Sequence, residues 1–138
     1  MTEYDDWNRR VVDEFRANGG KVAQFEGRPL LLLHHTGAKT ETERVNPLVY
    51  LPVGDDFAVF ASKAGSDTNP AWYHNLRAYP DTEVEVGPDT VPVRARVAEG
   101  EERERIWSEQ KSVNSNFADY EKLTTRPIPV VVLERVAS

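Results

Sequence analysis

The sequence predicts a mainly β protein of the α+β class: an antiparallel barrel, closed or half open, of about six strands with peripheral helices. Two patterns support this. Short apolar runs of strand length recur through the chain, and most are joined by turn-type residues rather than by long helices. A few amphipathic or charged stretches fit helices on the outside. The 138 residues are enough for about one domain.

The chain begins with apolar residues at helical spacing, separated by charged ones. These apolar residues are Tyr4, Trp7, Val11, Val12 and Phe15. They predict an amphipathic helix that ends at Asn18-Gly19-Gly20. Residues 1–25 are expected to form this helix and a linker, and residues 26–138 the barrel, within a single domain overall. The apolar face should pack on the core or on a second copy. Contact with a membrane or a hydrophobic substrate is the alternative, although the polar face lacks the Lys/Arg bias of interfacial helices.

Residues 30–51 predict two strands joined by a long polar loop. The apolar runs Leu30–Leu33 and Val45–Leu51 flank this loop. The loop contains Gly37, Lys39, Thr40, Thr42 and Arg44. Glycine permits a sharp turn, while hydroxyl groups, exposed amides and two cations suit an anion such as phosphate. A plain solvated turn is the alternative.

The histidines do not predict a metal site. His34 and His35 are neighbours on a strand, so their side chains should point to opposite faces, and His74 lies in a different segment. The chain has no cysteine, which excludes a disulfide framework and thiolate ligands.

After a turn at residues 52–56, a strand is expected over Phe57–Ala61. Residues 62–68 then surround Lys63 with small and hydroxyl side chains, a second place where an anion could bind. A helix should follow, with Asn69 as its N-cap and Pro70 in its first turn. Its core face should carry Trp72, Leu76 and Tyr79, and its first free amides favour an anionic ligand.

The remaining chain predicts three more strands and two helical segments. Alternating residues indicate strands over Glu83–Val86 and Val91–Val97, and Pro92 suggests an edge position or a strand start. A charged helix is expected over Glu99–Gln110 with Ile106 and Trp107 inward, and a short helical or loop segment over Asn114–Leu123. A buried strand over Arg126–Leu133 closes the chain.

Composition argues against binding of nucleic acid and against a membrane-spanning segment. A net charge of −6 without a basic stripe argues against nucleic acid. No apolar run is long enough to span a bilayer, and the acidic start does not resemble a secretory signal. The expected location is the cytoplasm, with the inner face of the membrane as an option for the N-terminal helix.

Several of these segments, in order and at matching spacing, resemble the deazaflavin-dependent nitroreductase family. The matching segments are His-Thr-Gly-Ala-Lys-Thr at 35–40, Arg-Val-Asn-Pro-Leu at 44–48, Ala-Ser-Lys at 61–63, Asn-Pro-Ala-Trp-Tyr-His-Asn-Leu at 69–76 and Arg-Pro-Ile-Pro-Val-Val at 126–131. The resemblance covers nearly everything from Gly27 to Leu133. It implies a split β-barrel related to flavin-binding barrels, the cofactor F420 (8-hydroxy-5-deazaflavin), and hydride transfer to a quinone, a nitro compound or another conjugated acceptor.

The resemblance also assigns residues to the site. Loop and strand positions around Lys39 and Arg44 would hold the phosphodiester and polyglutamate side of F420, and the other stretches would wall the deazaflavin. The implied cofactor-binding residues are Ala38, Lys39, Thr40, Arg44, Val45, Asn46, Pro47, Leu48, Val49, Phe60, Ala61, Ser62, Lys63, Ala71, Trp72, Tyr73, His74, Asn75 and Phe117. Trp72 could instead pack into the core.

The substrate side departs from the family. Nitro-reducing relatives carry tyrosines at the positions of Asn114, Phe117 and Tyr120, of which only Tyr120 is retained. This departure argues against nitroimidazole activation and leaves Tyr120, Ser115 and Asn114 as candidate proton donors or oxyanion ligands. A non-catalytic F420 carrier and an FMN-dependent oxidoreductase of the same barrel superfamily are the alternatives. A homodimer is possible, since split barrels often dimerise.

Overall fold

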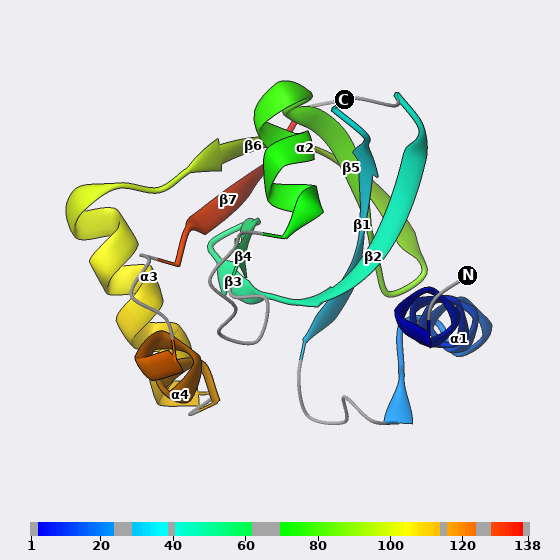
Figure 1. Cartoon of the computed structure of the whole chain (residues 1–138), viewed down its shortest axis with the longest axis horizontal. Coiled ribbons are helices and arrows are strands. Elements are labelled where there is room, and N and C mark those ends of the chain that lie inside the picture. Colours follow the sequence, from blue (N-terminus) through cyan, green and yellow to red (C-terminus); the bar gives the residue numbers. More distant parts are fainter. Residues whose placement is uncertain are drawn as a thin grey trace.

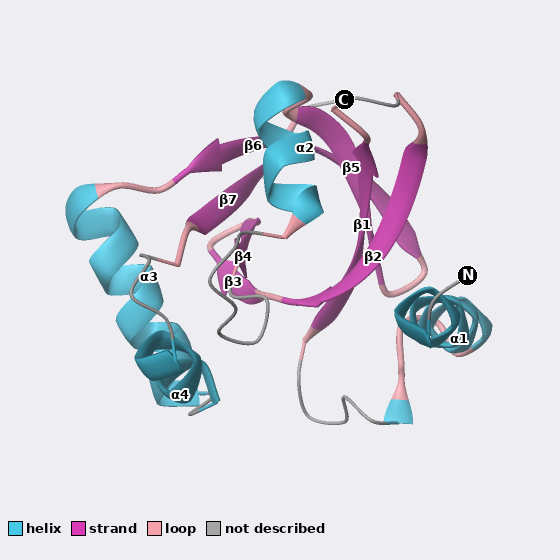
Figure 2. Ribbon diagram, in the orientation of Figure 1, coloured by secondary structure: helices cyan, strands magenta, loops and turns pink. Residues whose placement is uncertain are grey.

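A computed structural model of the chain describes residues 3–23, 29–38, 41–61, 70–113, 116–123 and 128–136. These residues form four helices and seven strands (Figures 1 and 2). The elements are α1 (Glu3–Ala17), β1 (Leu30–Thr36), β2 (Glu43–Val49), β3 (Leu51–Val53), β4 (Asp56–Phe60), α2 (Ala71–Ala78), β5 (Asp81–Val86), β6 (Asp89–Val97), α3 (Gly100–Val113), α4 (Asn116–Leu123) and β7 (Val130–Arg135).

All seven strands belong to one antiparallel sheet in the order β2-β1-β5-β6-β7-β4-β3. The two edge strands, β2 and β3, follow one another in the chain with only Tyr50 between them. The sheet must therefore curl until its edges approach each other, as Figure 1 shows. This confirms the predicted split barrel. There is one strand more than expected, because the run from Val45 to Leu51 divides at Tyr50, whose N–H bonds to Pro29 O at 3.1 Å.

Strand alternation divides the apolar side chains among three clusters. The interior cluster fills the curl of the sheet and is covered by α2. It contains Leu31, Leu33, Phe57, Val59, Ala61, Trp72, Tyr73, Leu76, Val84, Val91, Val93, Val131 and Leu133. Fully burying one such large side chain contributes about 1.5–3 kcal/mol. In Figure 1, α2 lies across the opening of the curled sheet.

The other two clusters lie on the outer side of the sheet, under different helices. Beneath α3 and α4, the outer aromatic cluster contains Leu51, Ala58, Phe60, Ala98, Ile106, Trp107, Phe117, Ile128, Val130 and Val132. Beneath α1, the N-terminal cluster contains Val11, Val12, Phe15, Val22, Leu30 and Leu32. The apolar face of α1 is thus buried against the sheet, as predicted for core packing. None of the described helices is long and apolar enough to cross a membrane.

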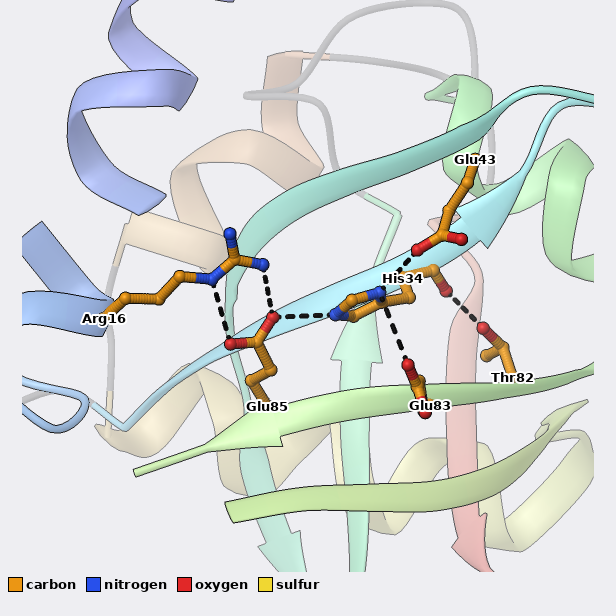
Figure 3. Close-up of polar contacts among 6 residues, drawn as sticks. All are labelled: Arg16, His34, Glu43, Thr82, Glu83 and Glu85. Carbon is orange, nitrogen blue, oxygen red and sulfur yellow. Dashed lines mark hydrogen bonds and ion pairs between the residues drawn. The ribbon is translucent and has the colours of Figure 1, made fainter. Parts of the chain in front are cut away.

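An ion pair also fastens α1 to the sheet. Arg16 donates from Nε and Nη2 to the two carboxylate oxygens of Glu85 on β5, at 3.1 and 2.7 Å. The same carboxylate bonds to His34 Nε2 at 2.7 Å (Figure 3). The chain then leaves the helix through Gly19 and Gly20, which both have positive φ, as the Asn-Gly-Gly signal predicts.

Four local predictions need correction. Pro92 lies on β6, between β5 and β7, and not at an edge. Proline is tolerated there because the ladder between β6 and β7 begins only at the next residue, Val93. Pro92 O still accepts from Val136 N, one residue beyond β7, but the N–H that proline lacks would lie outside the ladder. Pro70 is the N-cap of α2 and makes no side-chain cap bond, so the helix begins at Ala71. Tyr79 is 37% exposed, and Tyr73 takes its place in the core. The last strand begins at Val130, later than expected.

Candidate functional site

The polar loop after β1 closes on itself through its backbone. Gly37 N donates to Thr42 O at 2.9 Å, and Glu41 N donates to Gly37 O at 2.8 Å. Glu41 adopts a left-handed conformation, with φ of 56°, to complete the turn. Both ends of the loop are therefore fixed by short-range bonds. Lys39 and Thr40, which the sequence places at its tip, lie outside the described residues.

A buried histidine joins this loop to β2 and α2. His35 is 2% exposed, and its ring nitrogens lie 2.6 Å from Asn46 Oδ1 on β2 and 2.9 Å from Asn75 Nδ2 on α2. Asn75, also buried, accepts the N–H of Ala38 on its Oδ1 at 2.9 Å. Burial lowers the pKa of His35, and the positive charges of Arg44 and His34 act in the same direction. The imidazole is therefore neutral at physiological pH.

These bonds change the role that the sequence suggested for two residues. The N–H of Ala38 is directed at Asn75 and not at solvent, so it is not among the amides that could hold an anion in this arrangement. The side chain of Asn75 serves Ala38 and His35. Both residues hold the loop in place from within the protein.

The strand β2 presents its side chains alternately to two sides. Arg44, Asn46 and Leu48 lie on the side of His35 and the interior cluster. The other three predicted cofactor residues on this strand, Val45, Pro47 and Val49, pair in register with His34, Leu32 and Leu30 and lie on the side of α1. The predicted run therefore divides by alternation, and only every second residue, beginning with Arg44, lies on the side of His35 and the interior cluster.

Arg44 is an exposed cation among the described residues of this region. It pairs in register with His35, and no hydrogen bond or ion pair of its guanidinium is found within the described part of the chain. Nearby, α2 carries no acidic residue in its first turn, so the positive end of the helix dipole is not neutralised there. The side chains of Trp72 and Tyr73 pack in the interior cluster, whereas Ala71 and His74 are exposed. These features suit an anionic ligand.

The remaining described candidates gather in the outer aromatic cluster. Phe117 on α4 packs its ring against Phe60, Trp107 and Tyr120, with centroids 5.3–6.1 Å apart. Trp107 donates from Nε1 to Glu121 on α4, which fastens α4 to α3. Phe117 is buried and Tyr120 half-buried. Tyr120 is thus a phenol at the rim of an aromatic cluster.

The structure therefore sorts the predicted site residues into two groups. Ala38, Arg44, Asn46 and Asn75 lie around His35, and Phe60, Phe117 and Tyr120 meet in the outer aromatic cluster. Ala61 lies in the interior cluster at the end of β4. Lys39, Thr40, Ser62, Lys63, Asn114 and Ser115 fall outside the described residues. Over the described ranges, no cluster of three or more metal-ligating side chains occurs.

Sequence reasoning missed His35, which it considered only as a metal ligand. One usable signal was present: strand alternation places this histidine on the same face as Leu31 and Leu33, which is a buried face. A polar ring buried there needs hydrogen-bond partners. The identity of those partners depends on the hairpin register and on α2, which the sequence does not specify.

Comparison with known proteins gives one consistent result. The family described as F420H(2)-dependent quinone reductase matches residues 7–135. An F420H(2)-dependent quinone reductase of Mycobacterium tuberculosis is 41% identical over 126 residues, which cover 88% of this chain and 85% of that protein. A solved F420-H2 dependent reductase is 38% identical with a TM-score of 0.71, covering 78% of this chain and 95% of the other. A second solved structure, described only as a domain-swapped dimer, is 33% identical with a TM-score of 0.73, covering 96% of this chain and 100% of the other.

Proposed function

The chain belongs to the F420H(2)-dependent quinone reductase family, and from this premise we propose that it reduces a quinone with reduced F420, bound between the loop after β1, strand β2 and helix α2. The protein is an oxidoreductase and F420 is its cofactor. The nitro compounds considered from the sequence are secondary acceptors at most, because only Tyr120 of the three family phenols is present.

Arg44 is the observation that carries the placement of the cofactor. Arg44 is exposed, and no partner for its guanidinium is found among the described residues. It lies next to the polar loop after β1, which is held by the hydrogen bonds of Gly37 and Ala38. Phosphate and carboxylate groups are the anions that a guanidinium binds best. The phosphodiester and glutamate groups that the resemblance attributes to F420 fit this donor set, together with the first turn of α2.

The chemistry divides between cofactor and protein. Reduced F420 supplies a hydride when bound. Reduction of a quinone to a quinol takes two electrons and two protons, so a second proton must come from a side chain or from water. Tyr120 is our candidate donor, since its side chain is half-buried and a phenol O–H can donate a proton or a hydrogen bond to an acceptor oxygen. Asn114 and Ser115 remain candidates from the sequence.

Two partners considered from the sequence, a membrane and a second copy of the chain, can now be compared. A membrane contact through α1 is disfavoured, because Val11, Val12 and Phe15 are already buried against the sheet. A homodimer is supported by the related chain described as a domain-swapped dimer, which covers nearly all of this chain. Light scattering of the purified protein distinguishes a monomer from a dimer.

A cofactor titration followed by turnover tests the proposed function. Fluorescence titration with F420 and with FMN should show saturable binding of F420 and much weaker binding of FMN. Reduced F420 should then be oxidised when menadione is added. Tight binding of F420 without turnover on a panel of quinones would favour a carrier. Preferential binding of FMN would overturn the placement of F420.

A further inference from the structure

We propose that His35 is a positioning residue for the cofactor. As a neutral ring with its proton on Nε2, it binds Asn75 and Asn46. These bonds fix the two sides of the polar loop after β1, the side that leaves β1 and the side that enters β2, in one arrangement. This inference deepens the proposed function and rests on it. His35 does not contact the cofactor in this proposal. It acts through the residues on either side of the loop.

The direction of the hydrogen bonds follows from the one donor that cannot be reversed. The backbone N–H of Ala38 can only donate, so the Asn75 atom 2.9 Å away is its carbonyl oxygen. The other end of that amide is then Nδ2, which donates to His35 Nδ1 at 2.9 Å. A ring nitrogen that accepts carries no proton. The proton of the neutral ring is therefore on Nε2.

The second half of the chain of bonds follows directly. His35 Nε2–H lies 2.6 Å from Asn46 Oδ1 and donates to it. A single series of bonds thus runs from Ala38 through Asn75 and His35 to Asn46. It begins on the arm of the loop that leaves β1 and ends on β2, two residues after Arg44. Each bond has a defined direction, so the two arms are held in register across the loop.

This arrangement is specific to the neutral ring. If His35 Nδ1 gained a proton, two donors would face each other, since Asn75 Nδ2 also carries protons. A flip of the Asn75 amide would turn its oxygen to His35 and restore that bond. The flip would, however, turn Nδ2 toward the N–H of Ala38 and break the bond to Ala38. One bond would be lost in either case. The groups that act on His35 electrostatically are Arg44 on β2 and His34 on β1, both of which oppose protonation, while Asn46 favours it and Asn75 on α2 is uncharged. Burial makes the larger contribution and keeps the ring neutral.

The bonds of His35 depend on pH only on the acid side. The pKa of His35 lies below its ordinary value of 6.5, so the series of bonds is complete at neutral pH and is lost only as the pH falls through that lowered value. Cofactor affinity should follow the same course. F420 has ionisations of its own, but these are the same for every protein variant and cancel when two variants are compared at one pH.

The test uses two substitutions at His35 and one at its neighbour. His35→Phe keeps a flat ring and removes both bonds. His35→Gln keeps one donor and one acceptor and does not titrate. His34→Gln is the matched control, since His34 lies next in sequence and on the opposite face of β1. F420 affinity is measured by fluorescence titration from pH 7.5 to pH 4.5, with circular dichroism as a check of folding at each pH.

The expected results differ for each variant. At pH 7.5, His35→Phe should weaken F420 binding about 10-fold, the scale of a lost hydrogen bond between protein groups. His35→Gln should bind within about 3-fold of the wild type, on the scale of a retained pair of bonds. Its affinity should lack the acid-side decline that the wild type shows. His34→Gln should bind F420 as the wild type does at pH 7.5 and keep an acid-side decline, moved to a somewhat higher pH because the charge of His34 no longer lowers the pKa of His35.

A second readout needs no cofactor. Nitrogen-15 NMR of the wild-type imidazole rings at pH 7.5 should show His35 protonated on Nε2 and unprotonated on Nδ1. A proton on Nδ1 overturns the proposal, and so do identical pH profiles for the wild type and His35→Gln. If His35→Phe does not fold, these two measurements still decide. Failure of the wild type to bind F420 would overturn the proposed function and the cofactor role of His35 together, whereas the NMR result would stand as an independent finding on the ring.

Discussion

His34 on β1 and Glu85 on β5 lie 2.7 Å apart, from Nε2 to a carboxylate oxygen that also accepts from Arg16 of α1 (Figure 3). The other ring nitrogen of His34 lies 3.0 Å from Glu43 and 3.7 Å from Glu83. Both nitrogens therefore face carboxylates, which only accept hydrogen bonds when ionised. The doubly protonated, positively charged ring is the form that satisfies both. The two adjacent histidines thus have pKa values shifted in opposite directions, upward for His34 and downward for His35, on opposite faces of one strand.

The first prediction is that docking of α1 depends on pH through His34. Burial lowers the pKa of His34, but the hydrogen bonds to Glu43 and Glu85 outweigh it, and the net shift is upward from 6.5. A raised pKa gives a stabilisation that is full below 6.5 and is lost as the pH rises through the folded-state value. The pKa of Glu85 is lowered, chiefly by its bond to Arg16, so its contribution is lost as the pH falls below 4.5. The contact should be strongest between about pH 4.5 and 6.5.

Thermal and urea unfolding at several pH values measure this effect. The wild type should lose about 1 kcal/mol of unfolding free energy between pH 6 and pH 9 relative to His34→Gln, the scale of a partly exposed charged pair. Arg10→Ala, an exposed change on the same helix, should keep the wild-type dependence. Parallel pH curves for the wild type and His34→Gln would show that His34 is not charged in the folded protein.

A second prediction concerns the turn after α1. A Cβ atom on Gly20 would lie 2.6 Å from the Cα of Gly87 in the β5–β6 turn, and Gly20 has φ of +102°. Gly20→Ala should therefore destabilise the protein by about 2–4 kcal/mol, from backbone strain and from the forced separation of two backbones. Gly19 is the matched control, since it also has positive φ but nothing within 4 Å of its Cβ position.

Gly19→Ala should cost only about 1–2 kcal/mol, the left-handed penalty alone. Both variants are compared by urea unfolding. Equal losses for the two variants would mean that the contact between Gly20 and Gly87 does not constrain the position of α1.

The sequence predicted the elements better than it predicted their contacts. The helix at α1, the hairpin of β1 and β2 and the inward face of α3 follow from periodicity and turn residues, which are local properties. Pro92 was misplaced because strand order depends on contacts between distant parts of the chain. A proline in a strand indicates that one ladder is interrupted at that residue. Here the ladder with β7 begins just after Pro92, so β6 can lie inside the sheet. The N-cap of α2 shifted by one residue, within the usual uncertainty of a helix end.

The site shows the same division. Residue types suited to anions were visible in the loop, and Arg44 lies exposed as expected. That Asn75 turns inward to Ala38, and that Val45 and Val49 lie toward α1, depended on the strand register and on the packing of α2. The sequence therefore indicates which residue types suit an anion, whereas the residues that hold the loop in place depend on contacts between distant segments.

A third prediction tests the anion-binding side of the site. Arg44→Ala should weaken F420 binding by roughly 1.5–3 kcal/mol, the scale of a charged hydrogen bond, and leave stability nearly unchanged because Arg44 is exposed. Lys39→Ala, which tests the sequence-based expectation for the loop tip, should act in the same direction. Fluorescence titration gives the affinities and thermal unfolding checks the fold. Arg10→Ala on α1 is the control for a general loss of positive charge.

Increasing salt provides a second check on Arg44. The affinity of the wild type should fall with ionic strength more steeply than that of Arg44→Ala, because the variant has one fewer cation near the ligand. Wild-type affinity and wild-type salt dependence in a folded Arg44→Ala protein would remove β2 from the cofactor site.

The last prediction concerns the acceptor side. Tyr120→Phe should lower the turnover of menadione while leaving F420 affinity unchanged, because the phenol is expected to supply a proton and not to hold the cofactor. A positioned proton donor typically contributes about 10²–10⁴-fold, and water that reaches the half-buried position would replace part of that, so we expect a loss of about 10-fold or more. Tyr79→Phe, at the exposed end of α2, is the matched control and should keep wild-type turnover. Steady-state oxidation of reduced F420 by menadione measures both variants.

The ring of Tyr120 packs on Phe117 with centroids 5.3 Å apart, and phenylalanine preserves that packing. A lower rate in a protein of normal stability therefore reports on the hydroxyl group alone. Unchanged turnover would mean that water or another side chain supplies the second proton.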